Sequence, residues 1–494
     1  MKVIMIMYDS LNKRYLSPYG NNWMITPNFQ RLASHTVTFD NFFGCSFPCM
    51  PARRELQTGR PNFLHRSWGP SEPFDESMPE MLASKQIYSH LITDHCHYWE
   101  AGGANYWTHF SSFSFVRGQE GDKWSTTSVD GYDGVYQPRK QDIENRKWMS
   151  TEEKCSHVRC FEKGKDFIIE NQDKDNWFLQ LEYFDPHEPF FVPERFKKMY
   201  TEKDIPFDWP EYRRYDESEK EKVNDFIMNY AALVTMCDEY LGRILDIFDE
   251  YDLWKDTMLL VNTDHGFMLG EKGYVGKNYM PVYDEVANIP FFIHDPRHPE
   301  LDGTRTDALA QTPDIPCTIL DIFGVQKGKH MTGKSMLPVL EKDEKIHDAL
   351  IYGYFGMHVN VTDGHYTYMR AGQTEKNTPL FQYTLMPCHI QRPMQIPEIK
   401  NAEDMLCREF EFTEYTPVLK IPVDERYDKK RYYKYSTHEK YGTMLFDRIK
   451  DPMQENALEA GDIEREMIEK MITLMKEAES PEEQYVRLGL INYI

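Results

Sequence analysis

Two patterns of hydrophobic and polar residues alternate along the first two thirds of the chain. Short, continuous apolar runs are typical of strands that are buried on both faces of a sheet. The longer stretches between them repeat apolar residues at helical spacing, which predicts amphipathic helices. The apolar runs predict strands at residues 3–8, 90–93, 177–184, 258–262 and 290–293, and the helical patterns cover residues 78–85, 219–249 and 312–323.

This alternation of strand and helix predicts an α/β fold, with a mainly parallel central sheet that carries helices on both faces. In such a fold the functional loops gather at the carboxyl ends of the strands. Polar residues that directly follow predicted strands could therefore meet in one cleft. Those residues are Asp9, Asp94, His187 and Asp264.

The pattern of hydrophobic and polar residues changes near residue 349. Tyrosine-rich pieces at 351–355, 359–362 and 366–370 predict strands, and a helical pattern follows over 462–479. The sequence therefore predicts a main α/β domain over residues 1–345 and a smaller C-terminal α+β subdomain over residues 346–494.

Composition and charge narrow the function classes. Of the 494 residues, 40% are hydrophobic and 28% are charged, which is ordinary for a globular protein. The 57 basic and 80 acidic side chains give a formal net charge of −23. Such a field repels nucleic acid and anionic membranes, so neither is expected as a partner. An anionic substrate would need a locally positive pocket.

The cysteines and the apolar runs indicate the cellular compartment in which the protein is expected. The apolar run at the start is too short for the core of a signal peptide, and no run is long enough to span a bilayer. The nine cysteines are scattered and form no Cys-x-x-Cys pair, which argues against a zinc ribbon or a disulfide framework. We expect a cytoplasmic protein with mostly free thiols.

The sharpest motif is residues 49–59, which read Cys-Met-Pro-Ala-Arg-Arg-Glu-Leu-Gln-Thr-Gly. A free cysteine before a helix is usually an inert, buried residue. This segment, however, resembles the signature of the formylglycine-dependent sulfatases of the alkaline phosphatase superfamily. Cys49 and Arg53 stand at the family's offsets. Shorter segments that are similar to the same family occur in order from Val3 to about Asn456.

The resemblance implies an alkaline phosphatase-like fold in which residues 1–345 form the catalytic sulfatase domain. It also implies that a formylglycine-generating maturase oxidises Cys49 to an aldehyde. The hydrated aldehyde would supply a hydroxyl that becomes a good nucleophile on a metal ion. Arg53 would then steady the diol.

Asp9 and the Asp264-His265-Gly266 run are candidate metal ligands. Carboxylate oxygens and an imidazole suit a divalent cation, although each motif alone is short. Residues 264–277 resemble the family's second metal-binding segment, which implies that Asp9, Asp264, His265 and modified Cys49 hold the metal. Ca²⁺ is expected first, with Mg²⁺ or Mn²⁺ also compatible. Lys277 would grip the sulfate.

Histidines in two loops complete the candidate site. His187 lies between two prolines after a predicted strand, where a rigid loop presents one imidazole as a general acid. The loop resembles the family's Asp-Pro-His-x-Pro-Phe segment, which places its histidine against the sulfate ester. His95 and His97 would share one side of an extended chain and could form a zinc pair, but the sequence shows no further ligand cluster nearby. The family has Lys-x-His at this point, which implies that His97 is the base and that His95 contacts substrate.

The sequence departs from the family pattern at three positions. Ser10 stands where many sulfatases have aspartate, Ala52 replaces a serine, and His95 replaces the lysine. A single acidic ligand after the first strand also suits the related phosphonate monoester hydrolases and phosphodiesterases.

The expected activity is hydrolysis of a sulfate monoester of a small molecule or an oligosaccharide. The sequence does not decide whether the alcohol portion of this ester is a sugar, an aryl or an alkyl group. Phosphonate or phosphodiester hydrolysis is one alternative. A binding protein that keeps the fold but is never matured is the alternative from another class.

Overall fold

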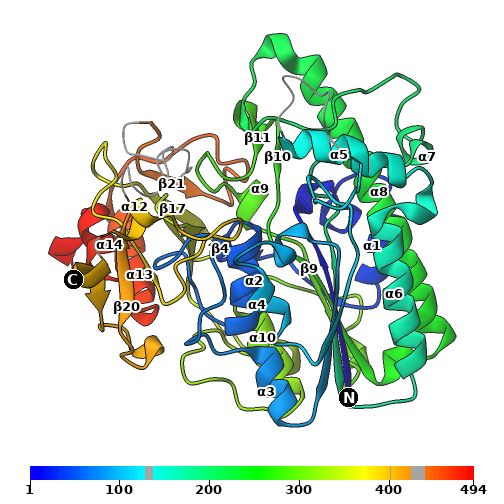
Figure 1. The fold of residues 1–494 in the computed structure, drawn as a ribbon, viewed down its shortest axis with the longest axis horizontal. Helices are drawn as coiled ribbons and strands as arrows, with labels where there is room; N and C mark the ends of the chain where they lie inside the picture. Colours follow the sequence, from blue (N-terminus) through cyan, green and yellow to red (C-terminus); the bar gives the residue numbers. More distant parts are fainter. Residues whose placement is uncertain (128–136, 401, 424–439, 494) are drawn as a thin grey trace.

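The computed structural model describes residues 1–127, 137–400, 402–423 and 440–493. Its centre is a twisted sheet with the strand order β13-β2-β12-β9-β1-β7-β5-β6 (Figure 1). In chain order the strands are β1 Lys2–Tyr8, β2 Val37–Phe39, β5 Tyr88–Thr93, β6 Ser112–Phe115, β7 Trp177–Tyr183, β9 Thr257–Thr263, β12 Phe291–His294 and β13 Arg305–Thr306.

Most neighbouring strands of this sheet run parallel, as predicted. β1 pairs in parallel with β7 and with β9, and β5 pairs in parallel with β7 and β6. The exception is β12, which runs antiparallel to β9 and β2. The predicted strand at 290–293 therefore exists but has the opposite direction from its neighbours.

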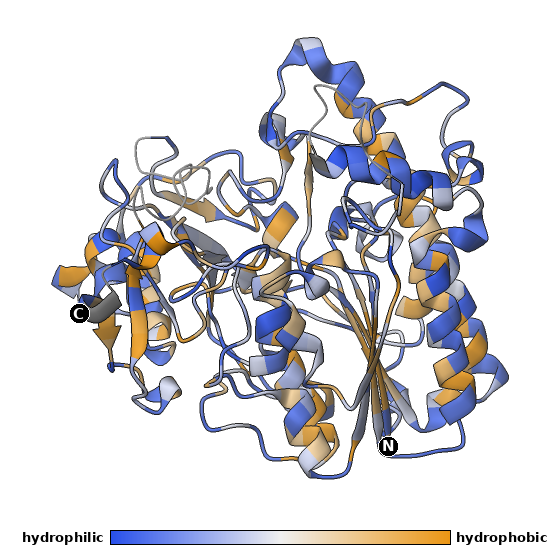
Figure 2. Ribbon diagram, viewed as in Figure 1, coloured by the Kyte–Doolittle hydropathy of each residue, from blue (hydrophilic) through white to orange (hydrophobic). Residues whose placement is uncertain are grey.

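Both faces of the central sheet are buried, which explains why β1 is an unbroken apolar run. Side chains of a strand point alternately to the two faces. Ile4 and Ile6 accordingly enter one hydrophobic core, whereas Val3 and Met5 enter the other. Figure 2 shows the hydrophobic colouring concentrated on the strands and on the helix surfaces that face them.

Helices cover the two faces (Figure 1). On one face lie α1 Pro27–Ala33, α6 Ser156–Asn171 and α8 Lys220–Glu250, and on the other lie α2 Cys49–Thr58, α3 Met78–Ser84 and α10 Asp314–Ile322. The predicted helices at 78–85, 219–249 and 312–323 are therefore confirmed as α3, α8 and α10. Within the described ranges, no helix is both long and apolar enough to cross a membrane.

A second sheet has the order β21-β17-β16-β15-β4. Its strands are β4 Ser46–Phe47, β15 Leu350–Tyr354, β16 Val359–Thr362, β17 Tyr366–Arg370 and β21 Met444–Asp447, and α13 Asp462–Glu477 packs against it. Most of this sheet comes from the C-terminal part, but β4 immediately precedes α2. The C-terminal strands therefore hold the start of α2. The division into residues 1–345 and 346–494 stays a prediction.

Candidate active site

Two carboxylates meet where neighbouring parallel strands end. Asp9 follows β1 and Asp264 follows β9, and the register aligns Tyr8 with Thr263. Both aspartates are fully buried. The parallel sheet thus brings together two residues that are 255 positions apart in the sequence, because the carboxyl ends of its strands share one edge.

Cys49 is the first residue of α2 and lies against this edge. Its Sγ is 3.3 Å from His265 Nε2 and 3.9 Å from Asp9 Oδ1. One ligand atom from each of four residues lies within 4.8 Å of the others, in a cluster with no exposed member. Those residues are Asp9, Cys49, Asp264 and His265, which are the four predicted metal ligands.

Arg53 lies one turn further along α2 and is fully buried among carboxylates. Its Nη1 donates to Asp264 Oδ2 at 2.8 Å and to the Cys49 carbonyl at 3.0 Å. Its Nη2 lies 3.0 Å from Asp9 Oδ2, and its Nε donates to Glu182 Oε1 at 2.6 Å. Arg53 therefore fixes the start of α2 relative to three acidic side chains.

The donor set of the cluster fits a divalent cation. Burial and then Lys277 lower the pKa of His265 to about 3, so its imidazole is neutral. Its Nδ1 donates to the Gly266 carbonyl at 2.9 Å, which leaves the lone pair of Nε2 pointing toward Cys49. Asp9 Oδ2 is buried and, among the described residues, is ion-paired with Arg53 Nη2 at 3.0 Å but accepts no well-aligned hydrogen bond. A buried oxygen of this kind is a suitable metal ligand.

The two aspartates differ in their pKa shifts. Burial and the charge of Asp9 raise the pKa of Asp264 well above its ordinary value. Burial also acts to raise the pKa of Asp9, but the nearby His187, Lys277 and Arg53 outweigh it and lower this pKa. Two carboxylates this close repel each other when both are ionised, and a divalent cation between them would remove that cost.

An unmodified Cys49 is a poor nucleophile in this environment. Burial, followed by the charge of Asp9, raises the pKa of its thiol well above the ordinary value. A reactive cysteine needs the opposite shift, because the thiolate is the nucleophilic form. The geometry therefore brings Cys49 to the centre of the cluster without activating it as a thiol.

Lys277 supplies a buried positive charge beside Cys49. Its Nζ donates to Ser10 Oγ at 2.9 Å, and it lies 3.5 Å from Cys49 Sγ and 3.7 Å from Asp9 Oδ1. Burial acts to lower the pKa of Lys277, but Cys49, Glu188 and Asp9 together raise it, so the amine stays protonated. Ser10 also donates to Asp9 Oδ1 at 2.8 Å. The hydroxyl of Ser10 thus links Asp9 and Lys277.

His187 lies in the loop after β7, on the same side of the sheet. Its Nδ1 donates to the Glu188 carbonyl, and because a neutral imidazole carries one proton, Nε2 is then an acceptor. Burial and then Lys277 lower the pKa of His187 well below its ordinary value. His187 is therefore neutral in the substrate-free site, whereas the predicted general acid must carry a proton on Nε2.

His95 and His97 lie close together, but not on one extended strand as the sequence suggested. The chain turns into the 3-10 helix η3, Cys96–Trp99, directly after His95. The ring centroids are nevertheless 5.1 Å apart, with the rings nearly perpendicular. His97 Nδ1 lies 2.5 Å from Glu100 Oε2. His95 is fully buried, and neither of its ring nitrogens has a hydrogen-bond partner among the described residues.

Sequence reasoning missed several acidic residues of the site, namely Glu100, Glu182 and Glu188. Glu182 could have been suspected, because it is a charged residue inside the apolar run that forms β7. Glu188 accepts a hydrogen bond from Tyr212 and lies 4.0 Å from Lys277 Nζ. Asp94, by contrast, accepts hydrogen bonds from the Phe184 amide and Gln119, so it braces the ends of β5 and β7.

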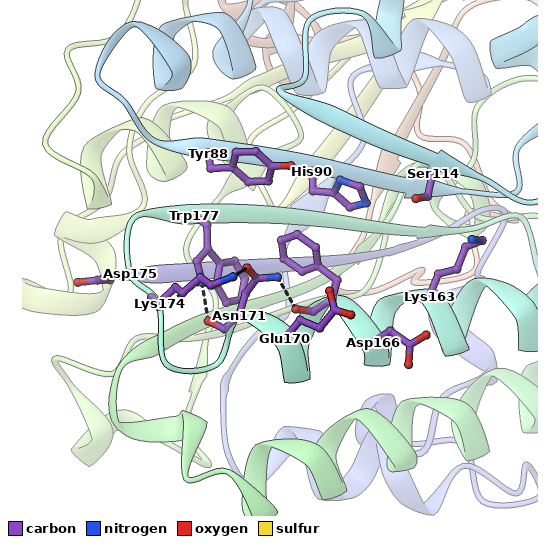
Figure 3. Close-up of a pocket in the computed structure, with 11 residues that line it drawn as sticks. Tyr88, His90, Ser114, Lys163, Asp166, Glu170, Asn171, Lys174, Asp175 and Trp177 are labelled. Carbon is purple, nitrogen blue, oxygen red and sulfur yellow. Dashed lines mark hydrogen bonds between the residues drawn. The ribbon is translucent and has the colours of Figure 1, made fainter.

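A separate cavity of about 630 Å³ lies at the opposite end of the sheet. Figure 3 shows Tyr88 and Trp177, the first residues of β5 and β7, on its wall, together with Lys163 and Asp166 from α6. None of the predicted site residues lines it. This cavity is therefore distinct from the buried cluster at the carboxyl ends of the strands.

Comparisons with known proteins identify the family of this chain and confirm its fold. The chain matches the Sulfatase family over residues 2–325, about two thirds of its length. This chain belongs to the sulfatase family and is a sulfuric ester hydrolase by class.

Its curated relatives include an arylsulfatase from Clostridium perfringens, 25% identical over 71% of this chain and 80% of that protein. An N-acetylglucosamine-6-O-sulfatase from Bacteroides thetaiotaomicron is 24% identical over 69% of this chain and 71% of that protein.

The solved structures that share the fold include a phosphonate monoester hydrolase from Agrobacterium radiobacter. It aligns with a TM-score of 0.64 over 97% of this chain and 96% of the other, at 18% identity. The predicted alkaline phosphatase-like α/β fold is thus confirmed.

Proposed function

We propose that this protein hydrolyses a sulfate monoester, using a formylglycine that a maturase makes from Cys49 and a divalent metal ion beside it. The observation that carries the proposal is the position of Cys49. It lies at the start of α2, within reach of three metal-ligand side chains and 3.5 Å from the ammonium group of Lys277. Burial, followed by the charge of Asp9, raises the pKa of the Cys49 thiol, which argues against a free thiolate nucleophile at this point.

Asp9, Asp264, His265 and the modified residue 49 would hold the metal. Three of these ligands offer oxygen, which favours Ca²⁺ or Mg²⁺, and the imidazole of His265 leaves Mn²⁺ compatible. When bound, the metal would lower the pKa of an aldehyde-hydrate hydroxyl and offset charge on the ester oxygens. Through its ion pairs with Asp9 and Asp264, Arg53 holds the two carboxylates and the start of α2 in fixed relative positions.

Lys277 and His187 would bind and protonate the substrate. Burial and then the charge of Lys277 lower the pKa of His187 in the free site; a sulfate beside Lys277 would offset the part due to the lysine and add negative charge near the imidazole. His187 could then hold a proton on Nε2 and donate it to the departing alcohol oxygen. The acid is thereby formed on substrate binding, which follows from its neutral state in the free site.

His97 would act as the base, oriented by Glu100. Burial acts to lower the pKa of His97, but Glu100 and Glu120 outweigh it and raise the pKa. A carboxylate on Nδ1 fixes the tautomer and makes the other ring nitrogen a stronger base. The ring of His95 contacts that of His97, and burial followed by the charge of Arg53 lowers the pKa of His95, so it would offer a neutral imidazole to substrate in the position of the family's lysine.

Replacing Lys277 by methionine should lower kcat/KM by about 10²–10³-fold. This is the usual cost of removing one preorganised group that stabilises charge in the transition state. Activity is measured on matured enzyme with a sulfate monoester. Lys272→Met is the matched control, since Lys272 lies in the same segment but pairs with Glu285 at 3.3 Å. Equal losses in both variants would refute the role of Lys277.

Glu100→Gln should shift the acidic limb of the kcat/KM profile to lower pH. A base must be neutral, so activity falls as the pH drops through the pKa of His97. Glu100 and Glu120 raise that pKa and Arg53 lowers it, so loss of the Glu100 charge moves it down. The profile is compared with that of Glu162→Gln, a change on the outer surface of α6. An unmoved limb in Glu100→Gln would contradict the pairing.

Phosphonate monoester hydrolysis is the second candidate, favoured by one observation. Asp9 is the single carboxylate directly after β1, because Ser10 takes the next position and bonds to Lys277. A panel of sulfate monoesters, phosphonate monoesters and phosphate diesters on matured enzyme separates the two. We expect the highest kcat/KM for a sulfate monoester. A higher value for a phosphonate would reverse the assignment, and no turnover together with no metal binding would favour a non-catalytic binding protein.

A further inference from the structure

A second group of metal-ligand side chains lies outside the predicted metal site. It consists of Cys96, His97 and Glu120, whose Sγ, one ring nitrogen and one carboxylate oxygen lie within 4.8 Å of one another. Cys96 and His97 belong to η3 after β5, and Glu120 lies in the loop after the neighbouring parallel strand β6. The two loops therefore meet at the carboxyl edge of the sheet, as the loops of the main cluster do.

The spacing within this group suits a small tetrahedral ion. Cys96 Sγ and Glu120 Oε2 are 3.8 Å apart. Two ligands of a tetrahedral zinc ion, one sulfur and one oxygen, lie about 3.5 Å apart by the usual bond lengths. A thiol, an imidazole and a carboxylate together favour Zn²⁺ over Ca²⁺ or Mg²⁺, which prefer oxygen alone.

The surroundings of the group are acidic. Glu100 lies 2.5 Å from His97, and burial followed by Glu120, Glu100 and Asp122 raises the pKa of Cys96. Burial raises the pKa of Glu120 to about 7. Asp122 is paired with Arg117. Cys96 and His97 are buried, whereas Glu120 is partly exposed and gives the group a side open to solvent. A cation here would stabilise the ionised forms of the thiol and the carboxyl group.

We propose that Cys96, His97 and Glu120 form a second, zinc-selective site, and that Zn²⁺ bound there inhibits the enzyme by occupying His97. Zinc would displace the thiol proton of Cys96 to solvent and take a ring-nitrogen lone pair of His97. The inhibitory part rests on the proposed function, because it needs His97 to act as the base. The binding part does not.

Cobalt binding tests the site without any turnover. Co²⁺ replaces Zn²⁺ in such sites, and a thiolate ligand gives it a charge-transfer absorption band. The titration uses Cys49→Ala protein with excess Ca²⁺, so that the main cluster offers no thiol. We expect the band in Cys49→Ala, its loss in Cys49→Ala/Cys96→Ser, and its retention in Cys49→Ala/Cys155→Ser. Cys155 is the matched control, since it is similarly buried in the described structure. A band that is absent, or that survives Cys96→Ser, would overturn the proposal.

Zinc inhibition tests the consequence. Each matured variant is assayed with saturating Ca²⁺ at rising Zn²⁺, and its rate is divided by its own rate without zinc. We expect the inhibitory zinc concentration to rise at least about tenfold in Cys96→Ser and in Glu120→Gln, since loss of one ligand weakens a metal site strongly. Cys155→Ser should match the wild type. Equal inhibition of all variants would overturn the inhibitory role. If no ester is turned over at all, the proposed function fails, and the cobalt titration still decides whether the site exists.

Discussion

Cys49→Ala is expected to lower kcat on a sulfate monoester by about 10⁴-fold or more. Loss of a covalent nucleophile removes a whole reaction path, so its effect is far larger than that of a binding residue. The side chain of Cys49 also contacts both His265 and Lys277. The measurement is single-turnover and steady-state hydrolysis by protein made alongside a maturase.

The control for this change is Cys237→Ala. Cys237 is fully buried like Cys49, but it lies on α8, across the sheet from α2. Thermal unfolding of both variants checks that each remains folded. A Cys49→Ala enzyme with near wild-type kcat would contradict the covalent path, and so would an equal loss in folded Cys237→Ala.

Removal of the divalent metal is expected to reduce kcat at least about 10³-fold, because a metal acting as a Lewis acid supplies several kcal/mol of transition-state stabilisation. The test is dialysis against a chelator, followed by addition of Ca²⁺, Mg²⁺ or Mn²⁺ in turn. Activity should return with at least one of these ions. Full activity after complete metal removal would contradict the role of the cluster.

Asp264→Asn should mimic part of this loss by raising the metal concentration that half-restores activity. The replaced carboxylate is a proposed ligand and also accepts from Arg53. Asp295→Asn is the matched control. Asp295 also follows a strand and is buried, but β12 runs antiparallel to β9, which puts Asp295 at the opposite end of the sheet. Its metal dependence should equal that of the wild type.

The sequence was sufficient for the parts of the fold with strong periodicity. The 31-residue helix α8 and the fully buried strand β1 carry long, regular patterns. The short strands β2 and β6 were missed, because three or four residues show too little pattern to separate a strand from a loop. The direction of β12 could not be predicted either, because an apolar run does not show whether a strand runs parallel or antiparallel to its neighbours.

The candidate site likewise contains residues whose positions could be predicted from the sequence and residues whose positions could not. Residues after long predicted strands, such as Asp9 and Asp264, could be placed together from the rule for parallel sheets. Glu100 and Glu120 could not, because their proximity to His97 depends on how two irregular loops meet. The neutral state of His187 was equally hidden, since it follows from burial and from the distance to Lys277.

The mass of the peptide that contains Cys49 is the most direct test of the central claim. The protein is produced with a formylglycine-generating enzyme, and a known substrate of that enzyme is produced in parallel as a control. We predict a loss of about 18 Da on this peptide, as an aldehyde replaces the thiol. An unmodified Cys49 beside a fully modified control would contradict the proposal that this residue becomes the nucleophile.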